Sequence, residues 1–233
     1  MKTKLFILSA LAATLIACGD ISPELEQFAG KENGHDYVDL GLSVTWAPVN
    51  IGATAIGEYG DLFAWGEIET KDYFDPQEYK WGYYISQKLF YNKYCINPSD
   101  GVVDNLTTLE PEDDAAHVLW GGTWRMPTEE EWKELRDNCT WKYSWENGVK
   151  GKKATGPNGN SIFFPLAGAQ HWDERVSKNI TGYYRSATLG PEYNGTYIVI
   201  IDSKDSDETT TGWSYGSRVF GMSVRPVCVP VGK

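Results

Sequence analysis

Carboxylates are the groups in this sequence that could most readily carry chemistry, and they gather in three clusters. The clusters are Asp113-Asp114, Glu129–Glu131 and Asp205–Glu208. Two carboxylates can serve a glycosidase as acid and base, and hard carboxylate oxygens suit calcium. Glu129–Glu131 is explained by helix capping, and Asp205–Glu208 is typical of a solvated loop. The calcium candidate is Asp202, Asp205, Asp207 and Glu208.

Cysteine and histidine give no metal or nucleophile motif. The chain contains no Cys-x-x-Cys, and its three histidines are scattered through the sequence. It also lacks His-Glu-x-x-His and a phosphate-binding loop. We therefore expect a protein that is not an enzyme, with no catalytic residue, no zinc or redox site and no cofactor.

The first 17 residues have the pattern of a secretory signal peptide. Lys2 and Lys4 precede the apolar run Leu5–Ile16, which is too short for a comfortable membrane span. The run ends in Leu15-Ile16-Ala17-Cys18, which resembles the bacterial lipobox and implies that the Cys18 thiol is acylated. The alternative is an ordinary signal peptide with an incidental cysteine. Acylation predicts a lipoprotein of the outer membrane or cell surface, attached to the membrane only through its lipid.

Composition divides the remaining chain into a tether and one domain. Residues 18–34 are polar and without periodicity, which predicts a lipidated flexible tether, and residues 35–230 form the domain. The formal net charge of −11 argues against nucleic acid as a partner. Ten Trp and 14 Tyr supply flat faces with polar edges, which suit both a core and a recognition surface.

Two helices are expected in the middle of the domain. Thr128-x-x-Glu131 forms a capping box that predicts a helix over Thr128–Asn138, and Trp132, Leu135 and Cys139 fall on one buried stripe. A shorter helix is expected over Glu112–Trp120. Its residues Ala115, Ala116 and Leu119 are expected to face inward.

The rest of the domain is expected to be strands and loops. The predicted strands are Leu62–Trp65, Ser161–Pro165, Gly182–Ala187, Thr196–Ile201 and Gly221–Val229. Residues 69–108 show no clear period and are expected to be a loop-rich insertion. These elements predict an α+β domain with two helices, short and mostly antiparallel strands, and long loops.

Several motifs resemble a known family. Arg125-Met-Pro-Thr-Glu-x-Glu-Trp132 is similar to the helix-opening motif of the formylglycine-generating-enzyme superfamily, which has a C-type-lectin-like fold. Three further stretches point to one branch of this superfamily. They are residues 37–46, residues 60–67, and Gly182-Tyr-Tyr-x-Ser186 together with residues 223–227. Together they resemble the major paralogous domain family first named for Fibrobacter succinogenes, common among lipoproteins of gut bacteria. The resemblance covers roughly residues 35–230.

The resemblance has two consequences for the cysteines. Formylglycine generation needs a copper-binding cysteine pair near the C-terminus, but the corresponding stretch Thr211–Gly221 has no cysteine, so that activity is not expected. C-type-lectin-like folds also bring the capped helix near the last strand. This implies a Cys139–Cys228 disulfide that leaves Cys95 as a thiol, although the two sulfurs could instead pack side by side reduced.

The resemblance also places a ligand face on the late strands and their loops. Aromatic planes beside Asn and Arg suit a sugar or a protein epitope. For Tyr184 and Trp213 the alternative is packing in the core. The binding candidates are Tyr183, Tyr184, Arg185, Tyr193, Asn194, Trp213, Tyr215 and Arg218.

The function expected from these features is recognition. We expect a surface- or periplasm-exposed lipoprotein module that binds a glycan or a partner protein through its late-strand loops. The second hypothesis is a structural subunit or tip component of a surface assembly that uses the same loops for docking. The third is an enzyme of unknown reaction.

Overall fold

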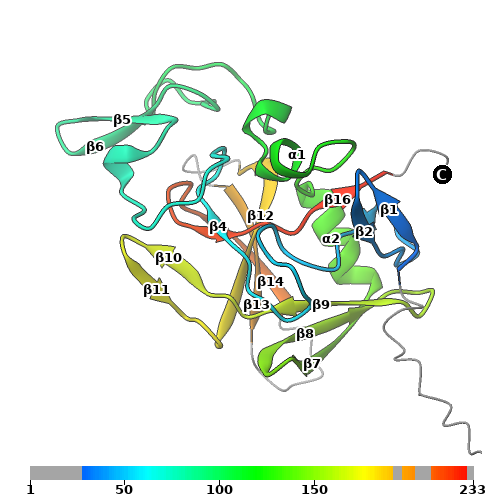
Figure 1. The fold of residues 1–233 in the computed structure, drawn as a ribbon. Coiled ribbons are helices and arrows are strands. Elements are labelled where there is room, and N and C mark those ends of the chain that lie inside the picture. The colour runs from blue at the N-terminus through cyan, green and yellow to red at the C-terminus, as the bar shows by residue number, and fades with distance from the viewer. Residues whose placement is uncertain (1–27, 191–195, 203–210, 230–233) are drawn as a thin grey trace, which may run out of the picture.

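Strands dominate the described part of the chain, which also contains two short α-helices (Figure 1). The computed structural model describes residues 28–190, 196–202 and 211–229. The helices are α1 (Ala115–Trp120) and α2 (Glu129–Asn138), with 3-10 turns η2 (Pro76–Glu78) and η3 (Pro111–Asp113). The strands are β1 (Gly30–Glu32), β2 (His35–Tyr37), β3 (Thr45–Trp46), β4 (Leu62–Phe63), β5 (Gly82–Ile85), β6 (Lys88–Tyr91), β7 (Thr140–Glu146), β8 (Val149–Thr155), β9 (Ser161–Pro165), β10 (Ala169–His171), β11 (Glu174–Val176), β12 (Thr181–Leu189), β13 (Thr196–Asp202), β14 (Thr211–Gly216), β15 (Met222–Ser223) and β16 (Val227–Cys228).

The central sheet is five-stranded, in the order β14-β13-β12-β15-β4. Its pairings are antiparallel except for β12 with β15. A three-stranded sheet, β7-β8-β9, lies below it in the view of Figure 1, and four two-stranded sheets surround these two. The prediction of an α+β chain with mostly antiparallel strands is confirmed.

Helix α2 begins where its capping box predicts. Thr128 Oγ1 accepts from the Glu131 amide at 3.3 Å, and the Glu131 carboxylate accepts from the Thr128 amide at 2.8 Å. Arg125 forms a two-pronged ion pair with the same Glu131 carboxylate. Trp132, Leu135 and Cys139 are buried, so the predicted stripe is confirmed.

Helix α1 is shorter than expected. The Asp114 side chain accepts from the amides of Ala116 and His117 and so starts the helix at Ala115, after the 3-10 turn η3. Ala115 and Ala116 are buried as predicted, but Leu119 is 49% exposed. Trp120 faces the core in its place, because it lies four residues after the buried Ala116 and so shares its face of the helix.

Several hairpins lie in segments that the sequence analysis left without strands, among them β5–β6 and β7–β8. β5 and β6 fall within the predicted loop-rich insertion and project from the body at the upper left of Figure 1. β7 and β8 are joined by the two-residue turn Asn147-Gly148, whose φ values of 49° and 79° are both positive. That geometry is typical of a type I′ hairpin turn.

The folded domain also begins earlier than predicted. Residues 28–34 were expected in the flexible tether, but β1 pairs in register with β2. The Trp124 indole donates to the Glu32 carbonyl at 2.8 Å, and the Glu32 carboxylate accepts from the Thr123 amide at 2.9 Å. These contacts hold β1 against the turn that follows α1.

Aromatic rings fill two adjoining core clusters. One surrounds Trp132 with Trp46, Phe164 and Tyr184, and the other surrounds Trp124 and Trp65. Most of the tryptophan in this chain therefore serves packing.

Three buried arginines bind backbone carbonyls between the strands. Arg225 donates to Asn50 Oδ1 and to the carbonyls of Ala47, Pro48 and Phe163, at 2.8–3.2 Å. Arg185 donates to carbonyls of residues 217, 218 and 220 and to Thr196. Arg218 donates to the carbonyls of residues 93 and 94. These guanidinium groups connect segments that are far apart in the sequence.

The predicted Cys139–Cys228 disulfide is wrong. Cys95, Cys139 and Cys228 are all buried thiols. Cys228 lies on β16, where its sulfur is 3.1 Å from Thr45 Oγ1, while Cys139 packs in the cluster around Trp132. Burial raises the pKa of the Cys139 thiol to about 11, so it remains protonated and weakly nucleophilic at neutral pH.

Candidate functional site

Burial removes three of the predicted binding residues from the surface. Tyr184, Arg185 and Arg218 are fully buried: the Tyr184 hydroxyl donates to the Pro165 carbonyl, and both arginines bind backbone carbonyls. They hold the fold together and cannot contact an external ligand. This corrects the prediction for those three residues.

The other candidates have different positions. Tyr183 is partly exposed on β12. Trp213 and Tyr215 lie on β14, where their backbones pair with Val199 and Tyr197 of β13. Tyr193, Asn194, Asp205, Asp207 and Glu208 lie outside the described residues, as does Cys18, and only Asp202 of the calcium candidate is described, at the end of β13. Among the described side chains, no group of three or more possible ligands could hold a metal ion.

An exposed aromatic surface lies beside Tyr183, and we call it the Trp172 surface. Tyr73 and Trp172 are 43% and 37% exposed, with ring centroids 5.6 Å apart. His171 contacts Trp172 at 5.6 Å and Phe220 at 4.2 Å between centroids. Phe220 and Tyr183 both pack on a small cluster of Ala169 and Met222. The Trp172 surface therefore consists of Tyr73, His171, Trp172, Tyr183 and Phe220.

The β10–β11 hairpin positions the centre of this surface. Trp172 and Asp173 form its two-residue turn, and Trp172 has a φ of 59°, a left-handed conformation that favours glycine. The Phe74 amide donates to the Trp172 carbonyl at 2.9 Å and holds the turn against the 72–75 segment. A large side chain in a strained backbone position is a feature that concentrates at functional sites.

Polar groups rim the aromatic rings. The side-chain amide of Gln170 donates to the Asp72 carbonyl at 2.7 Å. Desolvation, followed by the nearby carboxylates of Asp75, Asp173 and Glu78, raises the pKa of Tyr73. The Tyr73 hydroxyl is therefore a donor at neutral pH, and the adjacent carboxylates are acceptors. Flat apolar rings with acceptors at their edge can bind a neutral molecule that carries many hydroxyl groups.

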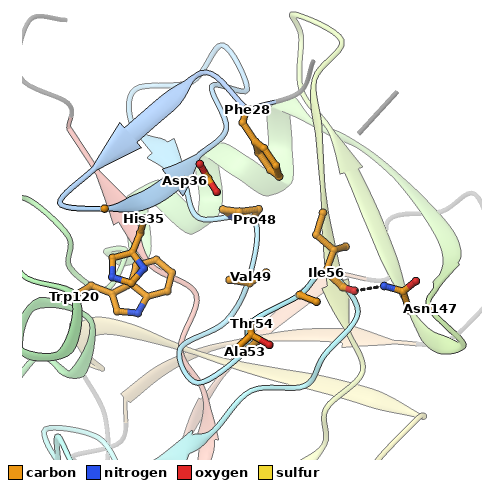
Figure 2. A pocket seen from close by; sticks show the side chains of 12 residues that line it. Phe28, His35, Asp36, Pro48, Val49, Ala53, Thr54, Ile56, Trp120 and Asn147 are labelled. Carbon is orange, nitrogen blue, oxygen red and sulfur yellow. Dashed lines mark hydrogen bonds between the residues drawn. The ribbon is translucent and has the colours of Figure 1, made fainter. Parts of the chain in front are cut away.

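A separate recess lies between the β1–β2 hairpin, α1 and the loop that follows β3 (Figure 2). Its volume is about 540 Å³, and His35 and Trp120 stack in its wall at 4.0 Å with nearly parallel planes. Burial, then the Lys31 charge, lowers the pKa of His35, so its ring is neutral at pH 7. Asp36 is ion-paired with Lys31 at 2.7 Å. The walls of this recess are largely apolar, and its two ionisable side chains, His35 and Asp36, already interact with Trp120 and Lys31.

The Asp113-Asp114 pair has a structural role. Asp113 accepts from Lys80, Lys93 and Tyr94, at 2.7–3.1 Å. Asp114 is buried, caps α1 and also accepts from the Met126 amide. These hydrogen bonds join α1 and the turn before it to the segments packed around them.

Sequence reasoning missed Trp172 and Tyr73 as exposed residues. Tryptophan and tyrosine occur both in cores and at recognition surfaces, so residue type alone did not show where these two rings lie. The one usable signal was the His-Trp-Asp-Glu stretch at residues 171–174, where charged neighbours interrupt a strand pattern.

Comparisons of the chain with protein-family models, with curated proteins and with solved structures gave no match. Over the part of the chain that the structure describes, neither helix is long and apolar enough to cross a bilayer. The assignment of function therefore depends on the geometry of the sites.

Proposed function

We propose that this chain is a recognition module that binds a glycan through the Trp172 surface. The observation that carries the proposal is the exposed Tyr73–Trp172 pair, held in place by a strained turn beside carboxylate acceptors. The C–H faces of a sugar ring pack on aromatic planes, while its hydroxyl groups donate to acceptors at the rim. Because the rim is acidic, a neutral glycan suits this surface better than an acidic one.

Replacing Trp172 with alanine is expected to abolish glycan capture while leaving the melting temperature within a few degrees of the native value. The ring is partly exposed and belongs to none of the core clusters of the described residues, so its removal changes the core little, as is usual for surface substitutions. Binding would be measured on an array of neutral and acidic glycans, with thermal unfolding measured on the same samples.

The matched control is Trp145→Ala, which removes another exposed tryptophan, one on β7. It should leave capture unchanged. Capture that survives Trp172→Ala would contradict the proposed surface. Absence of binding to every glycan, with recovery of a protein partner that Trp172→Ala abolishes, would favour the partner-protein form of recognition.

We also propose that the domain has a C-type-lectin-like fold and reaches the outer membrane or cell surface as a lipoprotein. The fold proposal is supported by the capping box of α2, the Arg125–Glu131 ion pair and the α+β layout. The anchoring proposal rests on the apolar run that ends at Cys18.

Cys18→Ser is expected to yield a protein without lipid because the serine hydroxyl is a far weaker nucleophile than a thiolate. Labelled-palmitate incorporation in the bacterial host would measure this, with Cys95→Ser as the matched control that retains the label. Equal labelling of the two variants would refute lipidation at Cys18.

A structural subunit of a surface assembly is the second candidate function, and the β5–β6 hairpin favours it. Tyr83, Tyr84 and Ile85 are all exposed on this projecting hairpin (Figure 1). Exposed apolar side chains on a projection are typical of a docking element for another protein.

A further inference from the structure

The acidic rim of the Trp172 surface comes from two segments that lie far apart in the sequence. The β10–β11 hairpin, at the left of Figure 1, carries Trp172 and Asp173 in its turn. The second segment contributes Asp72, Asp75 and Glu78 and contains no lysine or arginine. We call the four side-chain carboxylates of these two segments the rim carboxylates.

Hydrogen bonds fix these two segments against each other. The Phe74 amide donates to the Trp172 carbonyl at 2.9 Å and forms a β-bridge with the hairpin turn. The Gln170 side chain donates to the Asp72 carbonyl at 2.7 Å. Because Phe74 is buried, it anchors the second segment to the body of the domain. The carboxylates of the two segments therefore border the same pair of exposed rings.

Among the described residues, the rim carboxylates have no cationic partner. Lys71, which precedes them in the sequence, forms its ion pair with Glu67 at 2.6 Å and donates to the Glu78 backbone carbonyl at 3.2 Å. His171, the histidine of the Trp172 surface, lies opposite Glu174 in the hairpin register. The rim therefore keeps a negative charge that a cationic ligand can neutralise.

The two exposed rings inside this rim can bind a cation. Tyr73 and Trp172 have centroids 5.6 Å apart, and their planes are inclined by 58°. An ammonium group can therefore lie within about 6 Å of both centroids, the distance over which a ring face attracts a cation. Desolvation, and then the charges of three rim carboxylates, raise the pKa of the Tyr73 hydroxyl, so the negative field of the rim reaches this ring.

We propose that the Trp172 surface selects glycans that carry a free amino group, such as unacetylated glucosamine. This inference rests on the glycan-binding function proposed above and names the class of sugar. The ammonium group would lie over Tyr73 and Trp172 and donate to the rim carboxylates, while the C–H face of the sugar packs on the indole. N-acetylation removes the charge, so an acetylated sugar would keep the ring packing and lose the cationic contact.

Calorimetric titration of the full chain would test this selectivity with a glucosamine tetramer, its N-acetylated counterpart, a glucose tetramer and tetralysine. The glucosamine tetramer should bind about tenfold or more tightly than the other two sugars. Equal or weaker binding of this tetramer, with binding of the other sugars abolished by Trp172→Ala, would overturn the inference and leave the proposed function standing. Absence of binding to all three sugars would also overturn it, and the glycan array would then decide the proposed function. Tetralysine binding as tight as that of the glucosamine tetramer would overturn the assignment to a sugar.

Variants that remove charge but keep side-chain shape test the rim. Asp75→Asn combined with Asp173→Asn should weaken binding of the glucosamine tetramer about tenfold and leave binding of the N-acetylated tetramer unchanged. Glu112→Gln, at an exposed carboxylate of η3, is the charge-matched control and should bind both as the native chain does. Should the double variant fail to fold, Asp72→Asn with Glu78→Gln provides the same test. Unchanged binding of the glucosamine tetramer in these rim variants would overturn the proposal.

Discussion

Truncation of Trp132 to alanine is expected to lower the free energy of unfolding by about 3–5 kcal/mol. The Trp132 ring is buried with Trp46 at 4.9 Å and with Phe164 and Tyr184 at 5.8 Å between centroids. Its indole also donates to the Arg185 carbonyl at 3.1 Å. The variant would lose these contacts, open a cavity and leave a buried carbonyl without its donor. Chemical denaturation followed by circular dichroism would measure the change.

Trp145→Ala is the control for this experiment too. Trp145 is 54% exposed, so its truncation should change the free energy of unfolding by less than about 0.5 kcal/mol. Equal losses in the two variants would mean that the core around α2 does not have the packing described above.

The second large effect is expected at Arg225. Replacement by methionine should lower the free energy of unfolding by about 4 kcal/mol, because four buried acceptors lose their donors together. Burial lowers the pKa of Arg225 to about 10, which still leaves the guanidinium charged at neutral pH. The same denaturation assay applies, with Lys142→Met as a control that removes an exposed cation.

Arg225→Lys should fall between the native protein and the methionine variant. An ammonium group has three donors and no planar fork, so it cannot reach all four acceptors at once. A methionine variant as stable as the native chain would show instead that desolvation of the guanidinium cancels its hydrogen bonds.

Local sequence signals were enough for the best-predicted elements. The α2 boundary follows from Thr128 and Glu131, whose interaction spans only three residues. The β7–β8 hairpin carried an equally local signal in Asn147-Gly148, but lysines along β8 obscured its alternation. At the β5–β6 turn, Ser86 and Gln87 both adopt positive φ, and neither residue type indicates that conformation.

The binding residues were harder to predict because arginine and tyrosine suit either environment. Arg185 and Arg218 were taken for surface residues, yet the carbonyls that they bind belong to segments more than 30 residues away. Sequence spacing cannot reveal such partners. The exposure of Trp172 likewise depends on Phe74, a neighbour almost 100 residues earlier in the chain.

The pairing of β3 with β16 has a consequence for how the chain folds. Thr45 lies opposite Cys228, and Trp46 lies opposite Val227. The two paired strands therefore come from near the two ends of the described chain, and almost all of it forms the loop between them. Contacts between residues so far apart in the sequence form late in folding, because the loop between them must be ordered first. They also lower the folding rate. The core around Trp46 is therefore incomplete until the last strand has been synthesised. For a chain exported as we propose, this delay favours passage through the membrane before a stable tertiary structure forms.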